Sequence, residues 1–291
     1  MRTKTFKISL SLSVALITLG ALSLVAPFSS AAATIPLGSS TSYAVLAGSG
    51  VTNVGPTTIT GDLGSTPTGT YTGASSVTQS GAVHLADATA VAAQGGALAA
   101  FNNAGLQPST GTIVADLGGQ KLTPGVYTSA SSLGLTGTLT LDAGGDPAAV
   151  WIFRAGSTLT TAGASSVTII NGGSACNVFW QIGSSATLGT TSKMLGTVIA
   201  STSITATTGA TVQGRLLALN GAVTLDSNVI ATPVCTAPTP VVTPTPVVTP
   251  TPVVTPTPVV TPTPTPTPVQ VVVKPKGAVK TGDGSLGKVK R

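Results

Sequence analysis

A short repeat toward the C-terminal side of the chain constrains the fold more than any other feature. The segment Gly196–Ala200 returns as Gly214–Ala218, at a sequence offset of 18. The triplet Ala186–Leu188 returns at the same offset as Ile204–Ala206, and at a similar offset again as Val223–Leu225. Repeats this short cannot bury an apolar face alone, so successive copies must stack on their neighbours.

Apolar and hydroxylated residues alternate within each repeat, which is the period of a strand and not of a helix. The residues expected to point inward are Leu188, Ile204, Ala206, Val223 and Leu225. The threonines expected to point outward are Thr187, Thr205, Thr207 and Thr224. Coils wound in one direction give parallel strands with right-handed crossovers. The pattern predicts a mainly β fold, a right-handed parallel β-solenoid with roughly one coil per 18 residues.

The N-terminal end of the chain differs from this repeat region. Arg2, Lys4 and Lys7 precede an apolar run over residues 8–26 and a stretch of small residues that ends at Ala33. This order is typical of a secretory signal peptide, so we expect residues 1–33 to be cleaved and the protein to be secreted and extracellular. An uncleaved membrane anchor is the alternative, but the run is short and carries several serines. No later stretch is apolar enough to span a bilayer.

The C-terminal end is proline-rich and then basic. Residues 237–273 repeat the motif Val-Val-Thr-Pro-Thr-Pro, which cannot form a sheet ladder because proline lacks the N–H. We expect a polyproline II spacer of about 100 Å, at roughly 3.1 Å per residue. Residues 274–291 should form a basic disordered tail able to contact an anionic cell wall. The domain that folds should therefore cover residues 34–236.

The formal net charge of +6 does not indicate a nucleic-acid partner, because the positive charges lie at the ends. Three of the 13 basic residues fall in residues 1–33 and six in residues 274–291. The region between has four basic and six acidic residues, 4 − 6 = −2, and no glutamate. Phosphate binding needs clustered lysine or arginine, which this region lacks.

The two cysteines, Cys176 and Cys235, bracket the repeat region. In a secreted chain they are expected to pair, and closing a loop of about 60 residues would contribute on the order of 4 kcal/mol. A metal site is the alternative, but further cysteines and a nearby histidine are missing. We predict a disulfide and no metal.

An alanine-rich segment predicts one long helix over residues 85–105. Asp87 lies near its expected N-terminus, and Gly105 and Pro108 should end it. The stripe expected to pack along the solenoid is Leu85, Val91, Leu98 and Phe101. Two further apolar runs, residues 149–154 and 178–182, are typical of strands buried on both sides.

Five segments carry a resemblance to a known family. They are Ile59–Gly64, Leu135–Ala143, Val150–Phe153, Asn177–Gly189 and Gly214–Asp226. In this order they resemble the microbial ice-binding proteins, whose fold is a discontinuous right-handed β-solenoid with one helix alongside. The resemblance covers about residues 35–235. It implies that fold here, and a secreted antifreeze protein that adsorbs to ice through a flat threonine-rich face and slows ice growth or recrystallisation.

The implied mechanism agrees with the chemistry of ice, which offers a regular lattice of oxygens and no charge. In a parallel stack, neighbouring strands are about 4.8 Å apart and alternate residues about 6.6 Å apart, which is near the spacings of ice planes. Threonine is stiff at χ1 and loses little entropy on ordering.

The resemblance implies two candidate ice-binding ladders. The family's face tends to carry Thr, then Ala or Gly, any residue, then Thr or Asn, and Thr208-Gly209-Ala210-Thr211 fits this pattern. The first candidate set is Thr208, Thr211, Thr190 and Ser192; Lys193 departs from the pattern, because a long charged side chain would disturb a flat face. The second set is Thr160, Thr187, Thr205 and Thr224, with Thr138 and Thr140 as a continuation. For any single threonine, the alternative is a good strand residue on a solvated face.

Two other functions are compatible with a parallel β-solenoid. Parallel β-helices also serve as polysaccharide lyases and hydrolases, which need converging carboxylates. Asp142 and Asp146 are close in sequence but flanked by turn residues, and His84 lacks a catalytic or metal constellation. We therefore expect no enzyme and no cofactor. The third hypothesis is a cell-surface adhesin or wall-associated structural protein, which the spacer and basic tail favour. We expect a monomer whose partner is the surface of ice crystals.

Overall fold

The computed structural model of the protein describes residues 32–235. The predicted signal peptide, proline-rich spacer and basic tail fall outside these residues, apart from Ala32 and Ala33. The described part is mainly β, with one α-helix, α1 (Ala88–Leu106), and three short 3-10 helices, η1 (Gly38–Ser40), η2 (Ala74–Ser76) and η3 (Ala175–Asn177). All strand pairs in it are parallel, as predicted.

The strands form two sheets. The smaller sheet has seven strands, β2 (Gly50–Val54), β5 (Tyr71–Thr72), β11 (Leu133–Leu135), β14 (Leu159–Thr161), β17 (Ala186–Leu188), β19 (Ile204–Ala206) and β21 (Ala222–Asp226). The larger sheet has 15 strands, β1 (Tyr43–Ala47), β3 (Thr57–Thr60), β4 (Asp62–Ser65), β6 (Val77–Ser80), β7 (Val83–Leu85), β8 (Gly111–Thr112), β9 (Lys121–Leu122), β10 (Gly125–Ser129), β12 (Thr138–Asp142), β13 (Trp151–Ala155), β15 (Ser166–Ile170), β16 (Val178–Ile182), β18 (Lys193–Ala200), β20 (Thr211–Ala218) and β22 (Val229–Ala231).

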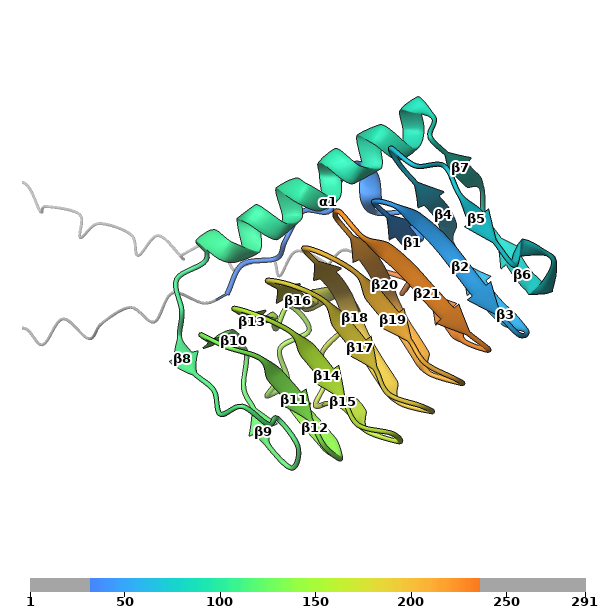
Figure 1. Ribbon diagram of the computed structural model, residues 1–291. Coiled ribbons are helices and arrows are strands. Elements are labelled where there is room, and N and C mark those ends of the chain that lie inside the picture. The colour runs from blue at the N-terminus through green and yellow to red at the C-terminus, as the bar shows by residue number, and fades with distance from the viewer. Residues whose placement is uncertain (1–31, 236–291) are drawn as a thin grey trace, which may run out of the picture. The chain divides into compact units, whose positions relative to one another are not determined.

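The sheets wrap into a stack of coils with three faces (Figure 1). The smaller sheet is the seven-stranded face, in the order β11-β14-β17-β19-β21-β2-β5. The larger sheet makes two faces because β18 and β20 bend. Their first halves belong to the third face with β15 and β22, and their second halves belong to the helix face with β16 and β1. Gly196 and Gly214 pair at the bend, where a Cβ on Gly214 would lie 1.7 Å from the Gly196 carbonyl oxygen.

The coils differ in length. Paired residues are offset by 18 between β17 and β19 and between β18 and β20, as predicted. The prediction is wrong for the earlier coils, where the offset is larger: Thr160 pairs with Thr187, and Thr138 pairs with Ser166. The additional residues form the turns that connect β12 to β13 and β15 to β16.

The stack is discontinuous along the chain. The N-terminal coil lies on the last coil, because β1 pairs with β20, β2 with β21 and β3 with β22. Helix α1 then carries the chain along the length of the stack from β7 to β8, at the opposite end (Figure 1). Strands remote in sequence therefore become neighbours, which matters for the surface described below.

Helix α1 packs on the helix face through alanines, and the predicted apolar stripe is wrong except for Phe101, which is half-buried and packs against the core. The buried residues are Ala90, Ala93, Ala97, Ala100 and Ala104, whereas Leu85, Val91 and Leu98 are 39%, 57% and 49% exposed. Small side chains allow the helix to lie close to the sheet, where Ile152 and Phe179 meet it in one cluster. At the N-terminus, the Asp87 carboxylate accepts a hydrogen bond from the Ala90 N–H (2.8 Å), as an N-cap.

The interior of the coils is aromatic at β13 and β16 and mainly aliphatic elsewhere. Trp151, Phe153 and Trp180 are fully buried, and the rings of Phe153 and Trp180 stack with centroids 4.2 Å apart. The runs 149–154 and 178–182 are thus buried on both sides, as predicted: alternate residues face the core and the helix. The five residues predicted to point inward in the short repeats are all at most 1% exposed.

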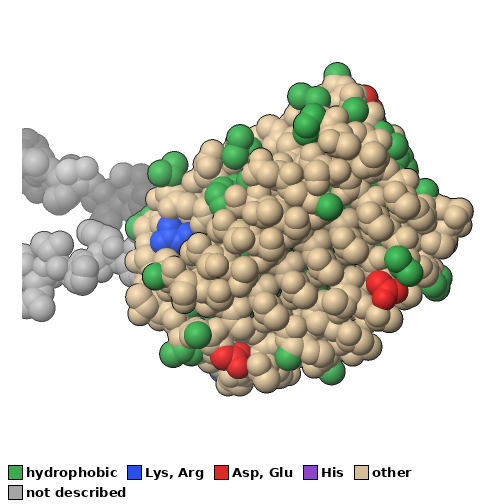
Figure 2. Space-filling model, in the orientation of Figure 1, with side chains coloured by type: hydrophobic (Ala, Val, Ile, Leu, Met, Phe, Trp, Pro, Cys, Tyr) green, Lys and Arg blue, Asp and Glu red, His purple; other side chains and the backbone are tan. Residues whose placement is uncertain are grey.

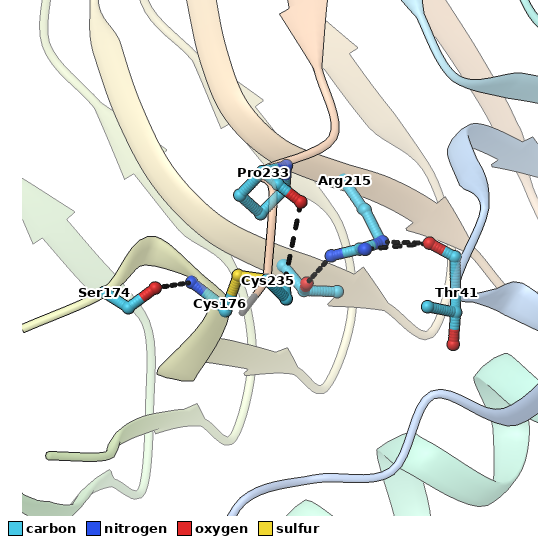
Figure 3. The surroundings of a disulfide bond; sticks show 7 residues. Thr41, Ser174, Cys176, Arg215, Pro233 and Cys235 are labelled. Atoms are coloured by element: carbon cyan, nitrogen blue, oxygen red, sulfur yellow. Dashed lines mark hydrogen bonds between the residues drawn. A yellow bond between two sulfur atoms is a disulfide. The ribbon is translucent and has the colours of Figure 1, made fainter. Parts of the chain in front are cut away.

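A disulfide and a buried arginine fasten the two ends of the folded chain to coils inside the stack (Figure 3). Cys176 and Cys235 are bonded, as predicted, across a separation of 59 residues. Nearby, Arg215 is 3% exposed and its Nε and Nη2 donate to the Thr41 carbonyl at 2.9 and 2.7 Å. Burial lowers the pKa of Arg215. The contact joins the last coil to the N-terminal segment, 174 residues away in sequence.

Candidate functional site

The outer side of the seven-stranded face carries an unbroken row of threonines. Pairing places Thr72 beside Thr52, Thr52 beside Thr224, and so on across the face. We call these six residues the threonine row: Thr72, Thr52, Thr224, Thr205, Thr187 and Thr160. Adjacent strands are about 4.8 Å apart, so the row spans roughly 24 Å. It ends at Gly134 of β11, which pairs with Thr160.

The hydroxyl groups of the threonine row have no hydrogen-bond partner among residues 32–235. All six side chains are exposed or half-buried, because each threonine alternates with residues that face the core. β-branching restricts χ1, so neighbouring side chains along the row hold similar directions. The surface therefore offers a regular series of hydroxyls and methyls that is free to contact water.

Small uncharged residues lie on one side of the threonine row, two positions earlier along each strand. They are Thr70, Gly50, Ala222, Ser203, Ser185, Thr158 and Ser132. No side chain there is larger than threonine, so this part of the face is low and even. Figure 2 shows the same side of the molecule: uncharged polar groups dominate it, and acidic side chains occur near its margins.

The second predicted ladder matches this row for Thr160, Thr187, Thr205 and Thr224. Its predicted continuation is wrong, because Thr138 and Thr140 lie on β12 of the larger sheet. Thr52 and Thr72 take their place, and sequence analysis missed them. For Thr52 the signal was present as a threonine flanked by buried Val51 and Asn53, but the strand that pairs with Thr52 lies near the far end of the folded region in sequence.

The first predicted set does not form one surface. Thr190 and Thr208 lie in corner turns between two faces, and Thr211 starts β20 on the third face. Ser192 is 2% exposed, so its predicted place on a surface ladder is wrong: its side chain points into the corner.

The hydroxyls of the three threonines of the first set are also engaged within the protein, whereas the buried Ser192 hydroxyl has no hydrogen-bond partner among the described residues. Thr208 donates to the Asp226 carboxylate, and Thr190 and Thr207 hydroxyl oxygens are 3.3 Å apart. Thr211 donates to the Ser192 carbonyl at 3.4 Å. Thr211 also pairs with Lys193, which is exposed, so a long charged side chain interrupts the third face.

Two carboxylates away from both candidate sets have local partners. His84 Nδ1 lies 2.8 Å from the Asp87 carboxylate at the start of α1, and hydrogen bonds from the Ala90 N–H and from His84 lower the pKa of Asp87. Asp142 lies 2.7 Å from the Lys121 ammonium group, which with Asn171 holds its pKa at about 2.

The described part of the chain was also compared with what a metal site, a ligand pocket and a membrane span require. Residues 32–235 contain no group of three or more acidic, histidine or cysteine side chains that could hold a metal ion. A hollow of about 470 Å³ lies beside the end of α1. The charged residue that lines it, Arg154, already donates to the carbonyls of Gly105 and Gln107 at 2.7 and 3.0 Å. Within the same residues, α1 is not long and apolar enough to cross a membrane.

Comparison with known proteins gives one consistent result. The model of the ice-binding-like family matches residues 45–231. An ice-binding protein of Nostoc sp. (strain HG1) is 45% identical over 204 residues, which cover 69% of this chain and 76% of the relative. The crystal structure of an ice-binding protein from the Antarctic ascomycete Antarctomyces psychrotrophicus is 44% identical, with a TM-score of 0.66 over 68% of this chain and 98% of that chain.

A more distant structure supports the same fold. The ice-binding protein LeIBP from an Arctic yeast is 26% identical, with a TM-score of 0.64 over 71% of this chain and 97% of that chain. The family match covers the coils, the helix and the complete threonine row. The chain therefore belongs to the ice-binding-like family.

Proposed function

We propose that this protein binds ice through the seven-stranded face and thereby inhibits ice growth or recrystallisation. The observation that carries the proposal is the threonine row, six residues in register whose hydroxyls have no partner among the described residues. The relatives named above are ice-binding proteins, which supports the same activity here. Neither an enzyme nor a cofactor is part of the proposal.

The threonine row suits ice because it repeats without interruption. Six rungs about 4.8 Å apart present hydroxyls to the oxygens of the lattice and methyls to the gaps between them. Both groups sit on strands with neighbours on either side, so little conformational entropy is lost when water orders against them. The helix covers another face, which leaves the seven-stranded face open on its outer side.

We further propose that the protein is secreted. The disulfide between Cys176 and Cys235 supports this, because such bonds persist in oxidising, extracellular environments. Attachment to the cell wall would depend on the residues after 235, which lie outside the described part of the chain.

The direct test compares Thr205→Tyr with Thr211→Tyr in residues 34–236. Thr205 is in the middle of the threonine row, whereas Thr211 is on the third face. A tyrosine at position 205 would hold the ice surface away from the two neighbouring threonines as well. The methyl groups of three threonines would then lose their contact with ice, and at about 0.8 kcal/mol each this loss is about 2.4 kcal/mol of binding free energy. That corresponds to a loss of affinity on the order of 50-fold. Thr211→Tyr should keep full activity.

Thermal hysteresis and recrystallisation inhibition measure the effect, and the melting temperature checks that both variants fold. Loss in Thr211→Tyr with full activity in Thr205→Tyr would assign the site to the third face and refute the proposed one. Absence of activity in the folded, oxidised parent domain would refute ice binding altogether. The adhesin hypothesis would then be the one to pursue.

A further inference from the structure

We infer that Asp226 limits the ice-contacting surface on one side of the threonine row and that its charge lowers affinity for ice. This inference rests on the proposed function. Asp226 ends β21 and points outward, two residues after Thr224, since Leu225 between them is buried. It is the one formally charged residue on the strands of the seven-stranded face.

The carboxylate of Asp226 stabilises a corner turn through hydrogen bonds. One oxygen accepts a hydrogen bond from the Thr208 hydroxyl, and the other accepts one from the Ser227 hydroxyl at 3.0 Å. The Asp226 carbonyl accepts the Gly209 N–H at 3.0 Å. These contacts tie the corner turn of one coil to the end of the strand in the next coil.

The same position borders the threonine row. Along β21, Asp226 and Thr224 share the outer side, and in the next strand Val54 pairs with Asp226 and Thr52 with Thr224. Ice adsorbed on the row would therefore extend over Asp226. A carboxylate binds water in its own geometry, and its desolvation costs free energy that a neutral residue does not lose. The two hydroxyl donors leave part of this acceptor capacity unused.

Asp226→Asn tests the inference because the amide keeps the shape and one oxygen acceptor but removes the charge. The matched control is Asp146→Asn, which changes the net charge equally at a turn outside the strands of this face, where the Asp146 carboxylate accepts a hydrogen bond from the Ala148 N–H at 2.8 Å. We expect Asp226→Asn to need a concentration lower by about twofold or more for half-maximal recrystallisation inhibition. Asp146→Asn should match the parent protein.

A second variant, Asp226→Ser, guards against an effect of the amide on the corner turn, and melting temperatures identify any variant that is destabilised. A folded Asp226→Asn and a folded Asp226→Ser that both equal the parent protein, or bind ice less well, would overturn the inference. An equal gain in Asp146→Asn would also overturn it, because net charge would then be the cause. Failure of the proposed function is distinct, since the parent protein itself would then be inactive.

Discussion

Gly134→Thr should extend the threonine row from six residues to seven and strengthen ice binding. Gly134 lies on β11 and pairs with Thr160 on one side and with Asp116 on the other. A Cβ built there would meet the Ala115 carbonyl oxygen at 3.4 Å and the Asp116 Cα at 3.9 Å. These are ordinary contact distances for a Cβ, so the position has room for a side chain on the outer side of the strand.

The expected gain can be worked from this geometry. One additional methyl buried against ice is worth about 0.8 kcal/mol, which is about fourfold in affinity. The domain itself should gain about 0.5–1 kcal/mol, because glycine weakens a strand through its unfolded-state entropy. For a domain of this size that raises the melting temperature by roughly 1–4 °C.

The matched control is Gly111→Thr, on the terminal strand β8 of the larger sheet. A Cβ at Gly111 would meet only the ring of Tyr127, at 3.9 Å. It should raise the melting temperature similarly and leave ice binding unchanged. The assay is the concentration for half-maximal recrystallisation inhibition, with thermal hysteresis at equal concentration. A stabilised Gly134→Thr protein with the parent's activity would show that the end of the row does not contact ice, and the reasoning from row length would be refuted.

Two further predictions concern stability. The double variant of Cys176 and Cys235 to serine should lose up to about 4 kcal/mol in denaturant unfolding yet keep ice binding, because neither cysteine lies on the seven-stranded face; equal unfolding free energies would contradict this. The ordinary pKa of Asp142, 3.8, falls to about 2 beside Lys121. A depressed carboxyl pKa stabilises the fold above the ordinary value, and that stability is lost as the pH falls through the folded value. The melting temperature should therefore drop between about pH 4 and pH 2, and less steeply in Lys121→Met; parallel profiles of the two proteins would refute the role of this pair.

The coil architecture was predictable because it follows from patterns within short, adjacent stretches of the sequence. Alternation of apolar and hydroxylated residues sets which side chains face the core, and the repeat offset sets which strands are neighbours. The greater length of the earlier coils was not predicted, because their additional residues lie in turns, which have no periodic sequence pattern. The stripe on the helix was misassigned for a related reason: propensity identifies a helix, but close packing against a sheet favoured alanine over Leu98 and Val91.

The full extent of the threonine row was not predictable from sequence spacing. Thr52 becomes the neighbour of Thr224 only because the N-terminal coil stacks on the last coil, although the two residues lie near opposite ends of the folded region in sequence. No repeat offset links them. The connection depends on a tertiary arrangement, in which α1 returns the chain to the far end of the stack and the Arg215 guanidinium fastens the N-terminal segment to β20.

The choice between the two ladders depended on whether each threonine hydroxyl is already hydrogen-bonded within the protein, which the residue type does not reveal. Thr208 and Thr205 are equally polar and close in sequence, yet one hydroxyl is bound to Asp226 and the other has no partner in the described part. Corner turns leave backbone and side-chain groups that need partners, and nearby hydroxyls supply them. Strand centres satisfy their backbone groups in the ladder, and on the seven-stranded face the threonine hydroxyls there have no partner among the described residues. In a solenoid, a surface for ordered water should therefore be sought at the middle of a sheet and not at its corners.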